Sequence, residues 1–85
     1  MSSPEIAADL CAAARSGDDI RLHLDDGEVV VARVLSWDGA ELVYAAVSSS
    51  RPERYAFCDS MGVGVALARI ARTQVLRGRP RRARR

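Results

Sequence analysis

Apolar and polar residues begin to alternate at Ile20, and this alternation constrains the fold more than any other feature of the chain. In "IRLHL" the apolar Ile20, Leu22 and Leu24 are separated by polar residues, a pattern typical of a strand with one buried face. Asp-Gly pairs follow at 26–27 and 38–39. Because Asp-Gly accepts the positive φ angles of tight two-residue turns, the sequence predicts antiparallel strands joined by hairpins.

Further strands are predicted downstream of the first. The third is "LVYAAV" (42–47), and the fourth is "RYAFCDS" (54–60), with Tyr55 and Phe57 on one face. The second, 28–37, is expected to be buried on both sides, as in a sheet that bends strongly around a small core. Its two apolar faces are formed by Val29, Val31 and Leu35 and by Val30, Ala32 and Val34.

The segment 62–76 has two interpretations. The favoured one places a bend at its Gly-Val-Gly start, then a short strand, a 3₁₀ turn near 67–70 and a last strand through Val75 and Leu76. A C-terminal helix over 65–76 is the alternative.

Residues 3–17, "SPEIAADLCAAARSG", are predicted to form a helix with both ends marked. Ser3 can cap it, Pro4 fits the first helical position, and Gly17 is placed to end it. A narrow apolar stripe recurs at helical spacing: Ile6, Leu10, Ala13 and Ala14. One helix followed by about five short, hairpin-linked strands describes a mainly β domain over 1–76, a small and strongly bent antiparallel barrel.

Size and composition narrow the class of protein. A chain of 85 residues makes one domain. Its longest apolar run is six residues, 42–47, which is too short to span a bilayer, and the N-terminus lacks the features of a signal peptide. We therefore expect a cytoplasmic protein with no membrane association. In that compartment Cys11 and Cys58 are interpreted as small hydrophobes, and neither a metal nor another cofactor is predicted.

Charge is divided unevenly along the chain. Residues 1–76 carry seven arginines against all eleven acidic residues, a net −4, whereas 77–85 carry six arginines, a net +6. Blocks of like charge are usually disordered interaction arms, and arginines near a nucleic acid neutralise phosphates whatever the sequence. The alternative is a tail that only aids solubility. The RNA-contacting candidates in this predicted disordered tail are Arg77, Arg79, Arg81, Arg82, Arg84 and Arg85.

Two loops supply further candidate contacts. Trp37 could stack on a base beside the hydrogen-bonding carboxylate of Asp38; alternatively, the tryptophan covers the barrel end and the aspartate fixes its own turn. In "SRPERY", Arg51, Arg54 and Tyr55 could form a cationic and aromatic contact surface, or only a stiffened, solvated loop.

Nothing in the sequence supports an enzyme. His23 is the only histidine, and no nucleophile or second titratable group accompanies it in a recognisable spacing. The "GVG" at 62–64 lacks the strand–glycine–helix context of a phosphate-binding loop. The protein is therefore predicted to be non-enzymatic.

The stretch "IRLHLDDGEVVVARVLSWDGAELVY" resembles the first sequence motif of Sm and Sm-like proteins. Ile20, Leu22, Leu24 and Gly27 match the opening of that motif, and Asp38 falls at its aspartate. The resemblance covers residues 3 to about 48. It implies an N-terminal helix and a five-stranded SH3-like barrel, commonly assembled into rings that bind RNA.

The chain departs from the family pattern at three places. Ala32 replaces a strand glycine, and "ARIAR" around Ile70 lacks the glycine of the second motif. Leu42 replaces the RNA-contacting asparagine, and leucine makes no side-chain hydrogen bond to a base. RNA contact is therefore expected mainly from the tail, with help from the loops.

Two functions remain open from the sequence. The first is an oligomeric RNA-binding module, since apolar residues on both strand faces and open barrel edges favour a homo-oligomer. The alternative is a protein–protein interaction or regulatory small-barrel module with no nucleic-acid role, whose barrel edge or "SRPERY" loop docks a partner.

Overall fold

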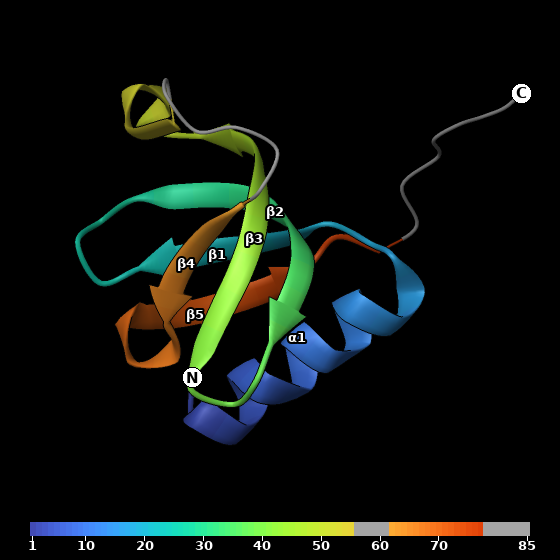
Figure 1. Cartoon of the computed structure of the whole chain (residues 1–85). Coiled ribbons are helices and arrows are strands. Elements are labelled where there is room, and N and C mark those ends of the chain that lie inside the picture. Colours follow the sequence, from blue (N-terminus) through green and yellow to red (C-terminus); the bar gives the residue numbers. More distant parts are fainter. Residues whose placement is uncertain (56–61, 78–85) are drawn as a thin grey trace, which may run out of the picture.

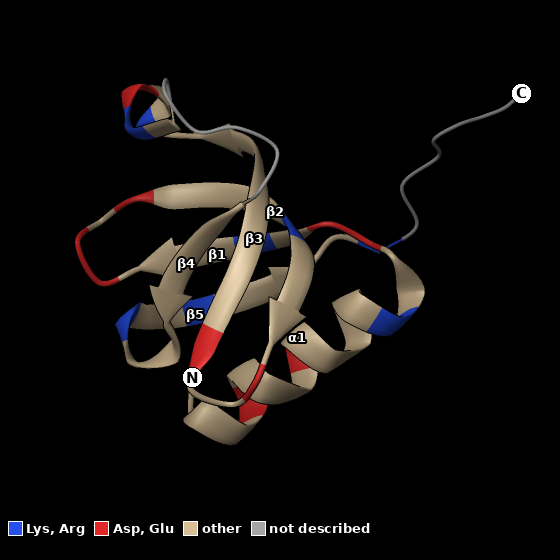
Figure 2. Ribbon diagram, viewed as in Figure 1, with Lys and Arg blue, Asp and Glu red and all other residues tan. Residues whose placement is uncertain are grey.

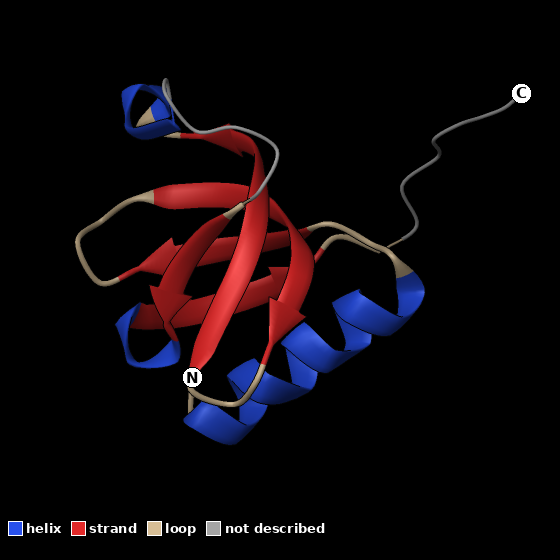
Figure 3. Cartoon of the chain, in the orientation of Figure 1, coloured by secondary structure: helices blue, strands red, loops and turns tan. Residues whose placement is uncertain are grey.

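The chain forms one α-helix and one five-stranded antiparallel sheet, drawn in Figure 1 and coloured by type in Figure 3. The computed structural model describes residues 1–55 and 62–77. Its elements in chain order are α1 (Ser3–Ser16), β1 (Ile20–Leu24), β2 (Val29–Trp37), β3 (Glu41–Ser49), the 3₁₀ helix η1 (Pro52–Tyr55), β4 (Val63–Ala66), the 3₁₀ helix η2 (Leu67–Arg69) and β5 (Ile70–Val75).

The strands lie in the order β4-β3-β2-β1-β5, and every neighbouring pair is antiparallel. The β2–β3 register shifts twice, between Val31 and Ala32 and between Val34 and Ser36, and the β1–β5 register shifts once. Such bulges bend a strand and increase its twist. The long central strands therefore curve, as Figure 1 shows, and the sheet wraps around one core.

The prediction of a mainly β domain with an N-terminal helix is confirmed. A closed barrel is not, because no pairing joins β4 to β5 in the part of the chain that the structure describes. The sheet is open, and β4 and β5 are its edge strands. The middle of the outer edge of β5 is partly covered by the chain start, since the Thr73 N–H lies 3.3 Å from Met1 Sδ.

The predicted helix is present, although its cap lies one residue earlier than expected. Ser2, not Ser3, accepts the Glu5 N–H, while the Glu5 carboxylate accepts the Ser2 N–H at 2.8 Å, forming a capping box. Gly17 ends the helix as predicted. Ala14 is exposed, so its predicted place in the apolar stripe is wrong. No helix in 1–55 or 62–77 is long and apolar enough to cross a membrane.

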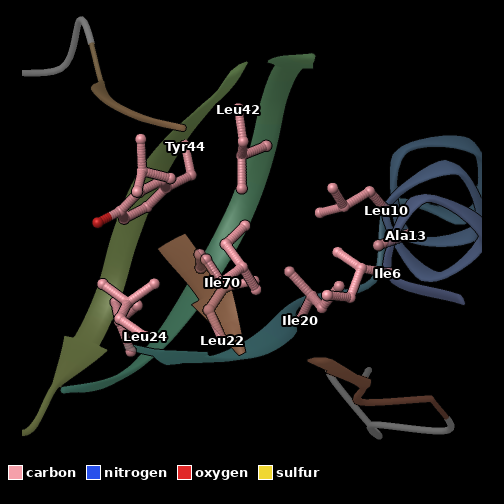
Figure 4. Packing of buried hydrophobic residues seen from close by; sticks show 12 residues of the cluster. Ile6, Leu10, Ala13, Ile20, Leu22, Leu24, Leu42, Tyr44 and Ile70 are labelled. Carbon is pink, nitrogen blue, oxygen red and sulfur yellow. The ribbon is translucent and has the colours of Figure 1, made fainter. Parts of the chain in front are cut away.

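One hydrophobic core joins the helix to the sheet (Figure 4). Ile6, Leu10 and Ala13 point from α1 towards Ile20, and all four are at most 4% exposed. The alternation predicted for β1 is confirmed, because its three apolar residues are buried and the two between them are not. The remaining core residues are Leu22, Leu24, Val30, Ala32, Leu42, Tyr44, Val65 and Ile70.

The predicted burial of β2 on both faces is wrong. Val30 and Ala32 are fully buried, whereas Val29 and Val31 are half-buried on the opposite face and Leu35 is 46% exposed. Helix α1 packs on the side of the sheet that holds the core, and no described element covers the other side. One of the two arguments for a homo-oligomer, the apolar second face, therefore rests on partly exposed side chains.

The fourth strand is also misplaced in the prediction. Arg54 and Tyr55, predicted to open that strand, belong to η1, while 56–61 lie outside the described residues; β4 is Val63–Ala66. The favoured order of a short strand, a 3₁₀ turn and a last strand in 62–76 is confirmed over the helix. Both Asp-Gly turns are present, but their connections, 25–28 and 38–40, are longer than two residues.

Candidate nucleic-acid interface

The β2–β3 turn uses its aspartate internally. Asp38 Oδ1 accepts the N–H groups of Ala40 and Glu41, each at 2.9 Å. These backbone hydrogen bonds hold the pKa of Asp38 below its usual value. Trp37 is half-buried and packs against the core. Both residues therefore have the structural role given above as the alternative to base contact.

The surroundings of this turn offer few polar groups. The turn lies beside η2, because Ala40 O accepts the Leu67 N–H at 2.9 Å. A shallow hollow next to it has only uncharged lining: Ser3, Pro4, Ala7, Gly39, Ala40, Leu67 and Ala68. Leu42 is 0% exposed, so the position where the Sm-like motif has its RNA-contacting asparagine belongs to the core. This turn therefore lacks the side chains needed to recognise a base.

The "SRPERY" loop is fastened to the β1–β2 turn by its two arginines. Arg51 donates to Asp26 O at 2.9 Å and lies 3.4 Å from Asp26 Oδ2. Arg54 lies 2.9 Å from Asp26 Oδ2 and 2.5 Å from Glu28 Oε1. Glu28 is the main cause of a raised Arg54 pKa. Both guanidinium groups are thus paired with acids of this turn, and each arginine side chain stays 42% exposed.

Glu28, which was not among the candidates predicted from the sequence, is the shared hydrogen-bond acceptor of this loop. Its side chain is fully buried, and its Oε2 accepts the Ser49 hydroxyl at 2.6 Å and the Tyr55 hydroxyl at 2.8 Å. The Tyr55 hydroxyl also lies 2.7 Å from that of Tyr44, and the two rings meet edge to face at 6.3 Å. Burial, followed by these hydrogen bonds, raises the pKa of Tyr55 far above its usual value.

A signal for Glu28 is present in the sequence. Glu28 has the same parity as the buried Val30 and Ala32, so the strand alternation points it inward. A carboxylate buried in this way requires charged or hydrogen-bonding partners, and the arginines and tyrosine of "SRPERY" are suitable donors.

A third arginine reaches the same turn from the other side. Arg69, at the end of η2, donates from Nε to Asp25 Oδ1 at 3.2 Å and lies 3.6 Å from Asp26 Oδ2. The pKa of Asp26 is held down first by a hydrogen bond from the Glu28 N–H and then by Arg51 and Arg54. We call the three acids and three arginines the turn cluster: Asp25, Asp26, Glu28, Arg51, Arg54 and Arg69.

The turn cluster adjoins a small cavity of about 170 Å³. Its walls come from β1, β3, η1, β4 and η2: Leu24, Tyr44, Arg54, Tyr55, Val63, Gly64, Val65, Ala66 and Arg69. A cavity of this size is smaller than the usual pocket for a small-molecule ligand. The cavity therefore gives no support to a small-molecule ligand.

The tail begins at an exposed residue just past the sheet. Arg77 follows β5 and shares a shallow hollow with Arg15 and the C-terminal half of α1. The other predicted tail contacts lie outside the described residues: Arg79, Arg81, Arg82, Arg84 and Arg85. Cys11 is a free, half-buried thiol, Cys58 lies outside the described residues, and no group of metal-ligating side chains occurs within 1–55 and 62–77.

The structure therefore separates the predicted contacts instead of gathering them into one site. Trp37 and Asp38 belong to the β2–β3 turn, whereas Arg51, Arg54 and Tyr55 contact the β1–β2 connection. Arg77 is exposed and forms no ion pair with a residue in 1–55 or 62–77. No family model, curated protein or solved structure matches the chain.

Proposed function

We propose that this chain is a non-enzymatic, Sm-like small β protein that assembles with copies of itself and binds RNA through its arginine-rich segment, 77–85. The proposed contact is electrostatic, and it requires no base-specific pocket. The order of one helix and five antiparallel strands supports the Sm-like part of the proposal.

The observation that carries the proposal is how the arginines are used within the fold. Arg51, Arg54 and Arg69 are each within 4 Å of a carboxylate of the β1–β2 turn. Charge that could attract an RNA strand must then come from arginines outside the turn cluster, and six of the thirteen in the chain lie in 77–85.

Open sheet edges support assembly. In 1–55 and 62–77 no strand pairs with the outer edge of β4 or of β5. An uncovered edge presents backbone N–H and C=O groups that pair readily with another chain. Several copies joined in this way would present several tails to one RNA strand, which strengthens weak individual contacts.

Binding of a fluorescein-labelled 12-nucleotide oligouridylate tests the RNA contact. We compare the full chain with a full-length variant in which Arg79, Arg81, Arg82, Arg84 and Arg85 are replaced by Gln. On single strands each neutralised phosphate contributes about 0.7 to the slope of log affinity against log salt, so losing all five contacts lowers that slope by about 3.5. The matched control replaces the same five residues by Lys, which preserves the charge and should preserve most of the slope.

Equal affinity and equal salt slope for the wild-type and Gln-tail chains would rule out the tail as the RNA contact. The open edges also favour a second candidate, a module that binds a protein by adding the partner's strand to β4 or β5. Absence of oligouridylate binding at low salt, together with a purified chain free of nucleic-acid absorbance, would favour this second candidate.

A further inference from the structure

The three neighbouring strands β5, β1 and β2 carry positive charge and no acid. Their arginines are Arg21, Arg33 and Arg72, and no Asp or Glu occurs anywhere in the three strands. Figure 2 shows blue segments on these strands, whereas the red segments lie in turns, on α1 and η1 and at the start of β3. The acidic excess of 1–76 is therefore absent from this part of the sheet.

Strand register places these side chains on one face. Arg21 lies opposite Gln74 on β5 and opposite Val31 on β2. Arg33 is two residues beyond Val31 and exposed, so it shares that face. The intervening residues of β1 point into the core, so this face is the outer one. His23 lies opposite Arg72 on the same face.

The arginines of this face are not neutralised as those of the turn cluster are. Arg21 donates to the neutral Gln74 Oε1 at 2.7 Å, and neither Arg33 nor Arg72 forms an ion pair with a residue in the described ranges. His23 lies in the positive electrostatic field of these arginines. Its pKa is lowered first by burial and then by Arg72 and Arg21.

We propose that Arg21, His23, Arg33 and Arg72, the basic sheet face, bind the phosphate backbone of the RNA strand that the tail captures. This inference rests on the proposed function and extends it from the tail to the folded domain. Neighbouring strands are about 4.8 Å apart, so charges on three strands are spread over about 10 Å, enough to meet more than one phosphate. Guanidinium groups also match phosphate geometry bidentately.

Val29 and Val31 give this face an apolar floor between its charges. Both are half-buried, and they lie opposite His23 and Arg21 respectively. A nucleic acid strand could place sugars or bases on this floor while its phosphates meet the arginines. Edge pairing between copies uses backbone groups in the plane of the sheet, so the outer face remains accessible in an assembly.

Neutralisation of the face in the full chain tests the inference. The variant Arg21→Gln, Arg33→Gln, Arg72→Gln should bind the 12-nucleotide oligouridylate at least about tenfold more weakly in 0.1 M salt and lower the salt slope by about 2. Among single variants, Arg33→Gln should weaken binding, whereas Arg33→Lys keeps the charge at the same exposed position and should retain most of the affinity. Circular dichroism checks that each variant is folded.

The single histidine supplies a readout that does not depend on affinity. When the oligouridylate is added, NMR of the Gln-tail variant should show a shift of the His23 imidazole signal and a rise in its pKa, because a nearby phosphate offsets the two arginines. A His23 signal and pKa that stay unchanged at saturating RNA would overturn the inference.

The two proposals fail in distinguishable ways. Loss of binding in the Gln-tail variant with full affinity in the face variant overturns the basic sheet face and leaves the tail as the contact. The reverse result overturns the tail and supports the face, and absence of binding by the wild-type chain at low salt overturns both. Equally tight, face-dependent binding of a polyglutamate of similar charge would overturn the assignment to phosphate.

Discussion

A single buried carboxylate holds together a loop that the sequence presents as a separate charged segment. Glu28 is 0% exposed and accepts hydrogen bonds from Arg54, Tyr55 and Ser49. A buried carboxylate is stable only while its partners remain, so each donor depends on the same acceptor. Residues 50–55 after β3 are therefore part of the folded unit.

Replacement of Glu28 by Ala should lower the free energy of unfolding by about 3 kcal/mol, because removing one partner of a buried ion pair leaves the others uncompensated. We expect the lower end of the usual range because the Arg54 side chain is 42% exposed and can regain water. Urea denaturation measures the change. The matched control is Glu53→Ala in the same loop, which is exposed and should change stability by less than about 0.5 kcal/mol. Equal losses in the two variants would contradict the role given to Glu28.

Tyr55 should make the fold sensitive to alkali. Its pKa is raised in the folded state, so the folded protein holds the phenolic proton more tightly than the unfolded chain, whose tyrosines ionise near pH 10. This contribution to stability is complete below about pH 10 and falls as the pH rises further, by up to about 1.4 kcal/mol per pH unit. Urea denaturation of the wild type and Tyr55→Phe from pH 8 to 11 should show a steeper alkaline loss in the wild type. Parallel curves would contradict the prediction.

At the scale of elements, local pattern predicts the sheet well wherever neighbouring residues decide the outcome. The alternation of β1, the Asp-Gly turns and the division of 62–76 into two strands and a 3₁₀ turn all follow from short stretches of sequence. The fourth strand was misplaced because the sequence of "RYAF" alternates like a strand. In the structure Arg54 and Tyr55 instead donate hydrogen bonds to Glu28, which lies 26 and 27 residues earlier in the chain. Partners this far apart in the sequence produce no alternation or other local pattern that could predict them. The candidate site was therefore predicted less well than the fold.

The connection into β4 depends on a glycine for two reasons. Gly62 has φ +94°, and a Cβ there would lie 2.7 Å from Leu35 Cδ1, 3.0 Å from Val43 Cγ1 and 3.1 Å from Tyr44 O. Left-handed backbone costs a residue with a side chain about 1–2 kcal/mol, and overpacking adds about 1–3 kcal/mol.

We expect Gly62→Ala to lower the free energy of unfolding by about 2–5 kcal/mol in urea denaturation. The control is Gly39→Ala, since Gly39 has the same φ of +94° but nothing within 4 Å of an added Cβ. The Gly39→Ala variant should lose only the free energy that left-handed backbone costs, about 1 kcal/mol. A loss for Gly62→Ala no larger than for Gly39→Ala would show that the side-chain contacts at β4 are not tight.

At the scale of the whole molecule, the fold sorts its charges into separate regions. The turn cluster pairs three arginines with three acids. The basic sheet face carries arginines and no acid, and residues 77–85 carry six further arginines. β5 is an edge strand and also carries Arg72 of the basic sheet face, but its edge pairs through backbone groups in the plane of the sheet while Arg72 stands on the outer face. Assembly through the edges and binding of a polyanion through the face and tail are therefore compatible in one molecule.

Assembly through the edges makes a prediction about concentration. Pairing between copies stabilises the folded state by mass action, so the Tm should rise with protein concentration, and light scattering should give a mass of several copies. The N–H of Thr73 points away from β1 towards Met1, so it is a backbone donor on the outer edge of β5.

Replacing Thr73 by Pro removes this outward donor and leaves the β1 ladder intact. The variant should scatter as a monomer and melt at a Tm that does not depend on concentration, because the incoming strand loses its partner. The matched Thr73→Ala also loses the hydroxyl that donates to Asp9 but keeps the outward N–H, and it should assemble like the wild type. If the wild type itself remains a monomer up to millimolar concentration, the edges do not pair, and the tail and basic sheet face must hold an RNA strand from one copy alone.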